Sequence, residues 1–290
     1  MLQCVGATAT ERVGVGRRCG QHLQSNKDLS VSFTYEGVGV AAAGPTKFHM
    51  RVVAKGRKLY IDSLYGPSPS DPNKMFAREL AFNGSRTTDF MKHLGSASVS
   101  VTRNDQAETR GLGFFDVNFL NLSEKYVGDD MSLHAFLRRP VCRVRKDPET
   151  IDGHQCVVVD CYEPGTEKVM ESVSIDTKHG FVPLRHVYKQ APEYDKPQME
   201  FVAKEVNQID GVWLITAGSK KLFPGALPQL PRFNQGAEWL MKVDRRPDGS
   251  PEIAVNRGVK DEFFDLWKRL PAGTMLVDAQ TGVAKRVVEH

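Results

Sequence analysis

The chain has 290 residues, of which 40 % are hydrophobic and 26 % are charged, a balance typical of a folded rather than a disordered protein. Its net charge of +4, from 39 basic and 35 acidic residues, is too small and too evenly spread to predict nucleic-acid binding. No run approaches the ~18 consecutive apolar residues of a membrane-spanning helix, so no transmembrane segment is expected.

The N-terminal residues differ in pattern from the rest of the chain. A secretory signal needs a basic start, an apolar run of ~7–15 residues and a small-residue cleavage site. The first twenty residues instead scatter their apolar side chains among Thr, Glu, Arg and Gly, so no signal peptide is visible. We predict that residues 1–28 form an N-terminal segment, helical in part within Glu11–Gln24, and that residues 29–290 form a single domain.

Alternating polar and apolar residues predict antiparallel strands along the first third of the chain. In the segment SVSFTYE, Val31, Phe33 and Tyr35 lie on one face and polar side chains on the other, which is the period of a half-buried strand. The dipeptide Asn83-Gly84 predicts a hairpin, because both residues tolerate positive φ. Strands are predicted at Ser30–Glu36, Lys47–Ala54, Lys58–Leu64, Leu80–Phe82 and Ser98–Arg103.

The middle of the chain has a different period. Residues 111–128 show mixed periodicity, whereas Met131–Arg139 predicts a short helix with Leu133, Phe136 and Leu137 on one side. Pro140 ends this helix. We expect its apolar side to pack onto a sheet.

Repeated turn sequences organise the second half of the chain. Ile-Asp-Gly begins at Ile151 and at Ile209, and D-x-x-x-G begins at Asp176 and at Asp278. In each turn the glycine can supply the left-handed residue that closes a hairpin. The turns separate strands predicted at Val141–Val144, Gln155–Tyr162, Glu171–Asp176, Val182–Tyr188, Met199–Gln208, Val212–Ala217 and Ala237–Asp244.

Two later segments do not read as regular strands. Leu222–Arg232 contains three prolines and is expected to be a loop over an edge or a face of the sheet. Asp261–Leu270 fits a strand and a helix equally well, so both remain open.

These elements predict a mainly β fold with few helices, of the α+β class. Hairpin connections between roughly ten to twelve strands exclude a parallel α/β sheet. An open twisted sheet of that size curls, and its concave face must be filled. The candidates are the helix at Met131–Arg139, the N-terminal helix, or a bound apolar ligand.

Motifs for chemistry are scarce. The chain lacks a nucleophile elbow, a phosphate-binding loop and the H-E-x-x-H motif, and an enzyme would need polar groups such as His154, His186 and Asp160 to converge in the concavity. His154 and Cys156 share a strand face, and His179, His186 and Cys161 lie on nearby predicted strands. This grouping leaves a soft metal site open as an alternative. The simpler interpretation, a polar turn residue beside a buried thiol, is favoured. We therefore predict no enzyme, no metal site and no cofactor.

The cysteine count of five leaves at least one without an intramolecular partner. Folding the hairpin about Asp152-Gly153 pairs Val144 with Cys161, which leaves Cys142 diagonal to Cys161 on the same face. A disulfide needs closer Cβ atoms than a diagonal usually gives, although a register shift of two would bring the thiols opposite each other. Two reduced cysteines are therefore favoured over a disulfide.

A basic cluster follows the predicted helix. It could contact anionic lipid or an acidic partner, but such a charge run is usually a solvated face. The cluster consists of Arg138, Arg139, Arg143, Arg145 and Lys146.

The remaining candidates are apolar side chains on the inward parity of successive strands. Most are expected to form the core, and some could line a cavity for an acyl chain or a hydrophobic peptide, which flexible Met and aromatic side chains suit. These candidate ligand-binding residues are Phe33, Tyr35, Phe48, Met50, Leu59, Ile61, Phe82, Val99, Val101, Val157 and Val159.

The C-terminal residues carry the most specific motif. Phe264-x-Leu266, followed by LPAGT at residues 270–274, Val277-Asp278 and Thr281-Gly282, resembles the last strands of LolA-like proteins, the periplasmic lipoprotein carriers and their relatives. Asp210-Gly211-Val212-Trp213 and the hairpin after Phe82 are similar to other turns of that family. The larger versions seen in planctomycete-type bacteria are the most similar.

The resemblance implies an incomplete β-barrel, in which about eleven bent antiparallel strands wrap over helices. It implies non-enzymatic binding or transport of lipid or lipoprotein acyl chains in the bacterial envelope, on an apolar concave face under a helical lid. A periplasmic or envelope location is implied in the same way. The alternative is an envelope protein-interaction or sensor module with the same fold and a filled core.

Overall fold

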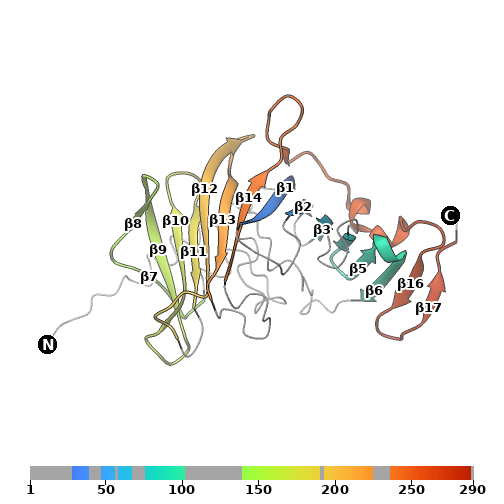
Figure 1. Ribbon diagram of the computed structural model, residues 1–290, viewed down its shortest axis with the longest axis horizontal. Helices are drawn as coiled ribbons and strands as arrows, with labels where there is room; N and C mark the ends of the chain where they lie inside the picture. Colours follow the sequence, from blue (N-terminus) through green and yellow to red (C-terminus); the bar gives the residue numbers. More distant parts are fainter. Residues whose placement is uncertain are drawn as a thin grey trace.

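A computed structural model describes residues 28–38, 47–55, 58–66, 76–101, 139–189, 193–224 and 236–288. Seventeen strands of this part of the chain join in one curved, open sheet (Figure 1). The strands are β1 (Leu29–Val38), β2 (Lys47–Lys55), β3 (Lys58–Gly66), β4 (Phe76–Phe82), β5 (Arg86–Met91), β6 (Ser96–Val101), β7 (Cys142–Val144), β8 (Glu149–Ile151), β9 (His154–Tyr162), β10 (Val169–Asp176), β11 (Val182–Tyr188), β12 (Met199–Ile209), β13 (Val212–Leu222), β14 (Ala237–Val243), β15 (Ile253–Val255), β16 (Met275–Asp278) and β17 (Ala284–Arg286).

The spatial order of the strands follows the chain in two blocks. From β9 each strand pairs antiparallel with the next as far as β14. On the other edge of β9, β8 pairs with its first residues and β7 with its last ones. Strand β14 pairs with β1, which joins the second block β1 to β6. Strand β16 then adds to β6 in parallel and pairs with β17. The block β9 to β14 and the block β1 to β6 thus meet where β14 pairs with β1, the strand that carries the fully buried Phe33.

The register of the ladders defines two faces of the sheet. Directly opposite residues of paired strands point to the same face, and the pairs Tyr35–Met241 and Tyr35–Phe48 connect β14, β1 and β2. We call the face that carries Phe33 and Tyr35 the inner face. It holds the main hydrophobic core, which collects side chains from β9 to β15 and from β1 to β3.

The opposite, outer face is covered at one end by the C-terminal segment (Figure 1). This segment contains the 3₁₀ helices η4 (Asp261–Phe264) and η5 (Leu266–Lys268). The side chains of Phe264, Leu266 and Leu270 form a second core with Tyr60 and Phe90 of the sheet. The C-terminal segment is therefore a small second layer on β2 to β6.

The strand count of about eleven was too low. Strands β7, β8, β15 and β17 have three residues each, and a period of two cannot be recognised over so few positions. The strand suggested at Phe264-x-Leu266 was also wrong, because these residues lie in the two 3₁₀ helices. A turn of 3₁₀ helix buries both side chains against the outer face of the sheet.

Two helices were expected to fill the concave face of the sheet, and neither is among the described elements. Met131–Arg138 and Glu11–Gln24 lie outside the described residues. Within the described residues, the helices are η4, η5 and η1 (Lys92–Leu94), each of three or four residues. None of these is long and apolar enough to cross a membrane.

The predicted turns are confirmed in detail. In both Ile-Asp-Gly turns the aspartate and glycine have positive φ, at 46° and 83° for Asp152-Gly153 and at 50° and 81° for Asp210-Gly211. These values are those of a two-residue turn whose twist matches that of the flanking strands. The Asn83-Gly84 hairpin is also present, with Gly84 at a φ of 100°.

Candidate functional site: the inner face of the sheet

The register of the strand pairs shows which candidate lining residues lie on the inner face and which do not. The pairs Phe33–Met50 and Leu59–Phe82 place the candidates of β1 to β4 on the inner face. The fully buried members of the main core are Phe33, Tyr35, Met50, Ile61 and Val159, with Phe48 and Leu59 half-buried against it. Phe82 is buried outside that cluster, and Val157 is half-buried.

Val99 does not belong to this lining. It pairs with Thr88, which pairs with Ala81 of the second core, so Val99 lies on the outer face. The alternation of SVSVTR separates two faces, but the apolar one shares the outer face with Ala97 of the second core. The side chain of Val101 lies outside those that the structure describes.

A row of cross-strand neighbours crosses the inner face from β10 to β14. Val173 pairs with His186, His186 with Phe201, Phe201 with Lys220, and Lys220 with Trp239. All five side chains are buried. The row therefore places an imidazole and an ammonium group among aromatic and aliphatic side chains.

Gly218 is required for this packing. A Cβ at this position would lie 2.6 Å from Cζ of the Phe201 ring and 3.1 Å from the carbonyl oxygen of Val202. The Phe201 ring therefore rests on the bare backbone of β13. Phe201 in turn separates His186 from Lys220 within the row.

Glu171 of β10 adds a buried carboxylate beside this row. Its side chain is 1 % exposed, and its Oε2 lies 3.6 Å from Nε2 of His186. Within the described part of the chain, neither carboxylate oxygen accepts a hydrogen bond. A buried polar group without a hydrogen-bond partner lowers the stability of the fold. Glu171 is therefore a candidate contact for the polar part of a ligand.

His154, His186 and Asp160 do not converge. Asp160 accepts hydrogen bonds from Nε and Nη2 of Arg145 at 2.8 and 2.7 Å and from the hydroxyl of Ser172 at 2.6 Å. The hydrogen bond to Asp160 raises the pKa of Arg145 against the opposing effect of burial. His186 instead faces Glu171. The catalytic grouping that the sequence left open is therefore not formed.

The basic cluster is partly used within the fold. Arg145 binds Asp160, and Arg143 lies 3.0 Å from Glu167. Arg138 lies outside the described residues. Two of the cluster's charges are thus neutralised by neighbours on the same sheet edge.

Cys142 and Cys161 form a disulfide, so the expectation of two reduced cysteines was wrong. The register differs by two from the simple hairpin, because Arg145 to Pro148 turn a corner between β7 and β8. Cys142 therefore lies directly opposite Cys161. Cys156 stays a free thiol, and its burial and the nearby Asp176 charge raise its pKa to about 11.

Two of the three histidines that the sequence grouped with Cys156, His154 and His179, meet at one rim of the sheet, whereas His186 does not join them. His154 and His179 both contact the carboxylate of Asp176, at 2.6 and 2.5 Å. Burial would raise the pKa of Asp176, but the hydrogen bonds from His179 and His154 outweigh it and lower the pKa. The sequence identified Asp176 as a turn residue alone. The D-x-x-H spacing from Asp176 to His179 is the signal that could have predicted this contact.

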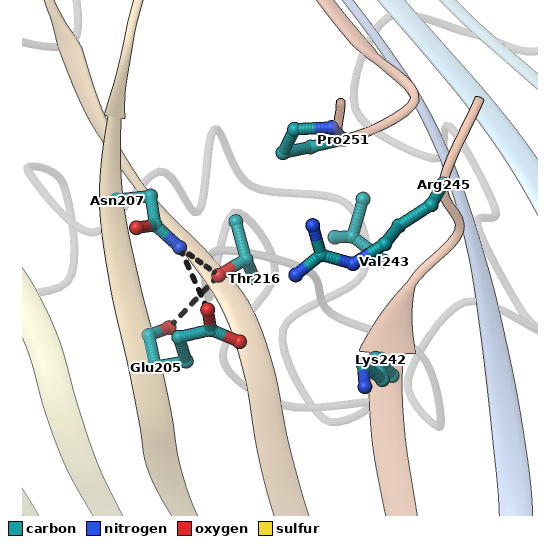
Figure 2. A pocket seen from close by; sticks show the side chains of 7 residues that line it. All are labelled: Glu205, Asn207, Thr216, Lys242, Val243, Arg245 and Pro251. Carbon is teal, nitrogen blue, oxygen red and sulfur yellow. Dashed lines mark hydrogen bonds between the residues drawn. The ribbon is translucent and has the colours of Figure 1, made fainter. Parts of the chain in front are cut away.

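Two hollows in the described part of the molecule lie away from the groups described so far. Figure 2 shows a polar one between β12, β13 and β14, where Nδ2 of Asn207 donates to Oγ1 of Thr216 at 2.6 Å and to Glu205 at 3.2 Å. Its volume of about 10 Å³ is near the minimum that a cavity needs to hold one water molecule. The larger one, about 470 Å³, lies between β1, β2 and the C-terminal segment, beside Val53 and Phe263.

Comparison with known proteins identifies the fold. The chain is similar to a DUF1329 family protein from Desulfovibrio piger, with 11 % identity, 90 % of this chain and 98 % of that chain covered, and a TM-score of 0.55. It is similar to a putative outer membrane lipoprotein-sorting protein domain from Vibrio parahaemolyticus, with 9 % identity, coverages of 90 % and 100 %, and a TM-score of 0.53. No family model and no curated protein matches the sequence.

Proposed function

From this LolA-like fold, we propose that the protein binds lipid or lipoprotein acyl chains on the inner face of its sheet, without catalysis. The observation that supports the proposal is the large cluster of buried apolar side chains on the inner face, which includes Phe33, Tyr35 and Met50. Burial of an acyl chain there supplies affinity at ~25 cal/mol per Å². Glu171 and His186 offer contacts for the polar end of the ligand.

The disulfide supports an envelope location. Disulfides persist in oxidising compartments such as the bacterial periplasm and are rare in the cytosol. The Cys142–Cys161 bond joins β7 to β9 at the edge of the sheet. A periplasmic or envelope carrier is the proposal consistent with this bond and with the similarity of the fold to a lipoprotein-sorting domain.

One observation favours the second candidate, a protein-interaction or sensor module with a filled interior. Phe33 is 0 % and Tyr35 1 % exposed, so the centre of the inner face is covered. A carrier with this structure must open before it takes up a ligand, and the opening step would control the exchange rate. An interaction module needs no such step.

The first test is native mass spectrometry of the full chain purified gently from its own host, followed by lipid extraction. A lipid or acylated peptide at near one-to-one occupancy supports the carrier. An empty protein that also fails to take up a fluorescent fatty acid contradicts the carrier and favours the filled module.

Paired variants localise the binding. Phe48→Glu places a charge on the half-buried margin of the inner face, whereas Leu64→Glu places one on the neighbouring strand, where Leu64 is 40 % exposed and pairs with His49. Uptake of the fluorescent fatty acid is expected to be lost in Phe48→Glu and kept in Leu64→Glu, with the strand signal in circular dichroism unchanged in both. Equal uptake of the fatty acid by both variants would exclude the inner face as its binding site.

A further inference from the structure

Three hairpins bring a separate group of side chains together at one rim of the sheet. His154 is the first residue of β9, Asp176 is the last residue of β10, and His179 lies in the loop to β11. One ligand atom from each of the three lies within 4.8 Å of the others. The indole of Trp213, at the start of β13, packs edge-on against the His179 ring at 4.7 Å.

Asp176 is the fixed member of the group. Its side chain is 1 % exposed, and its Oδ1 accepts the backbone N–H groups of Lys178 and His179 at 2.8 and 3.2 Å. The other oxygen, Oδ2, meets Nδ1 of His154 at 2.6 Å and Nδ1 of His179 at 2.5 Å. The carboxylate is thus anchored by the loop and directs one oxygen to both imidazoles.

A second copy of the same turn shows which of these contacts the loop itself needs. In the turn Asp278–Gly282, Oδ1 of Asp278 accepts the N–H groups of Gln280 and Thr281 at 2.9 Å each. Gly282 and Gly180 have nearly equal φ, 70° and 71°. The D-x-x-x-G turn therefore forms with one carboxylate oxygen and no imidazole, so the two histidines on Asp176 serve something beyond the turn.

The two imidazoles differ from the carboxylate in their freedom. The side chains of His154 and His179 are 35 % and 36 % exposed, so they can adjust while Asp176 stays in place. Zinc bonds to imidazole nitrogen and carboxylate oxygen are ~2.0–2.2 Å long, which separates tetrahedral ligand atoms by ~3.4 Å. The contacts of Oδ2 with the two Nδ1 atoms, at 2.6 and 2.5 Å, would lengthen by about 0.8–0.9 Å to reach this separation.

We propose that His154, Asp176 and His179 bind a divalent transition metal ion of the Zn²⁺ class. Two imidazoles and a carboxylate are a ligand set that suits Zn²⁺ better than Ca²⁺ or Mg²⁺, which prefer oxygen ligands alone. The protein supplies three ligands, so a fourth position at the rim is left for water or for a group on a partner. Such an ion would tie β9 to the β10–β11 hairpin.

The test uses Co²⁺ as a spectroscopic probe on the full, untagged chain, with Zn²⁺ as competitor. Wild type is expected to show ligand-field absorption that saturates with one Co²⁺ and is displaced by Zn²⁺. His154→Gln and His179→Gln remove one ligand each, and their affinity is expected to fall at least about tenfold, since even the loss of an outer-sphere partner costs that much. Asp176→Asn removes the charge but keeps Oδ1 as the acceptor that holds the turn.

His49→Gln is the matched control. Nδ1 of His49 lies 3.0 Å from Oδ2 of Asp244, a single imidazole on a carboxylate at the sheet surface, and its replacement is expected to leave Co²⁺ binding unchanged. Thermal unfolding without metal shows whether each variant is folded. Absence of Co²⁺ binding by wild type, or full binding by folded His154→Gln and His179→Gln, would overturn the proposal.

Discussion

At the scale of single residues, the inner face holds buried ionisable side chains among the apolar residues of its core. Glu171 of β10 lies directly opposite Cys161 of the main core, and its side chain is buried beside His186. The alternation of β10 places Glu171 on the same face as Val173 and Ile175. Its residue type predicts the opposite, because a glutamate in a strand usually faces solvent. Burial of such a group at a cost in stability is typical of sites retained for function.

Glu171→Met is expected to raise the free energy of unfolding by about 1–3 kcal/mol, because the variant replaces two buried oxygens that lack hydrogen bonds with an apolar side chain of similar length. The measurement is urea unfolding followed by circular dichroism. Glu200→Gln is the control: Glu200 is paired with Arg185 at 2.7 Å near the surface, and its loss is expected to lower stability by at most ~1 kcal/mol. A decrease in the stability of Glu171→Met equal to that of the control would contradict the cost assigned to Glu171.

At the scale of elements, the hairpins were predictable and their registers were not. The two Ile-Asp-Gly turns and the D-x-x-x-G turns determine local backbone angles, and each is found where the sequence placed it. The corner between β7 and β8 shifts the ladder by two residues and aligns Cys142 with Cys161. A corner of this kind depends on how the edge strand follows the curvature of the sheet, which no local pattern records.

Reduction of the Cys142–Cys161 disulfide is expected to lower the free energy of unfolding by about 3 kcal/mol, from the loop entropy of a 19-residue separation. Urea unfolding with and without dithiothreitol measures the difference. In the double variant Cys142→Ser/Cys161→Ser dithiothreitol should have no effect, whereas Cys156→Ser should keep the full effect because Cys156 is a free thiol. An equal response in the two variants would show that the disulfide does not stabilise the fold.

At the scale of the whole molecule, the C-terminal segment is docked on the outer face as a second layer. Its apolar contacts come from Phe264, Leu266 and Leu270. Two ion pairs complete the contact, since Nζ of Lys55 and Nζ of Lys58 lie 2.8 and 2.6 Å from the carboxylate of Asp261. The segment therefore links β2 and β3 to the strands β16 and β17 that extend the sheet.

This docking should depend on pH. Hydrogen bonds from Lys55 and Lys58 lower the pKa of Asp261 from 3.8 to about 2. A carboxyl group with a depressed pKa stabilises the folded state above its unfolded pKa, and this contribution is lost as the pH falls from about 4 through 2. Wild type should therefore lose more stability than Asp261→Asn over this interval in urea unfolding. Parallel curves for the two proteins would exclude a role for Asp261.

By itself the sequence determined the class of the fold, most strand positions, the turn geometries and the apolar character of the inner face. These follow from local periodicity and from backbone angles that Asp, Asn and Gly tolerate. The tertiary structure decided which parity of β6 is inside, that Cys142 and Cys161 are bonded, and that Asp176 joins His154 to His179. Each of these depends on registers between strands and on the curvature of the sheet, which arise from packing across the whole molecule rather than from neighbours in the chain.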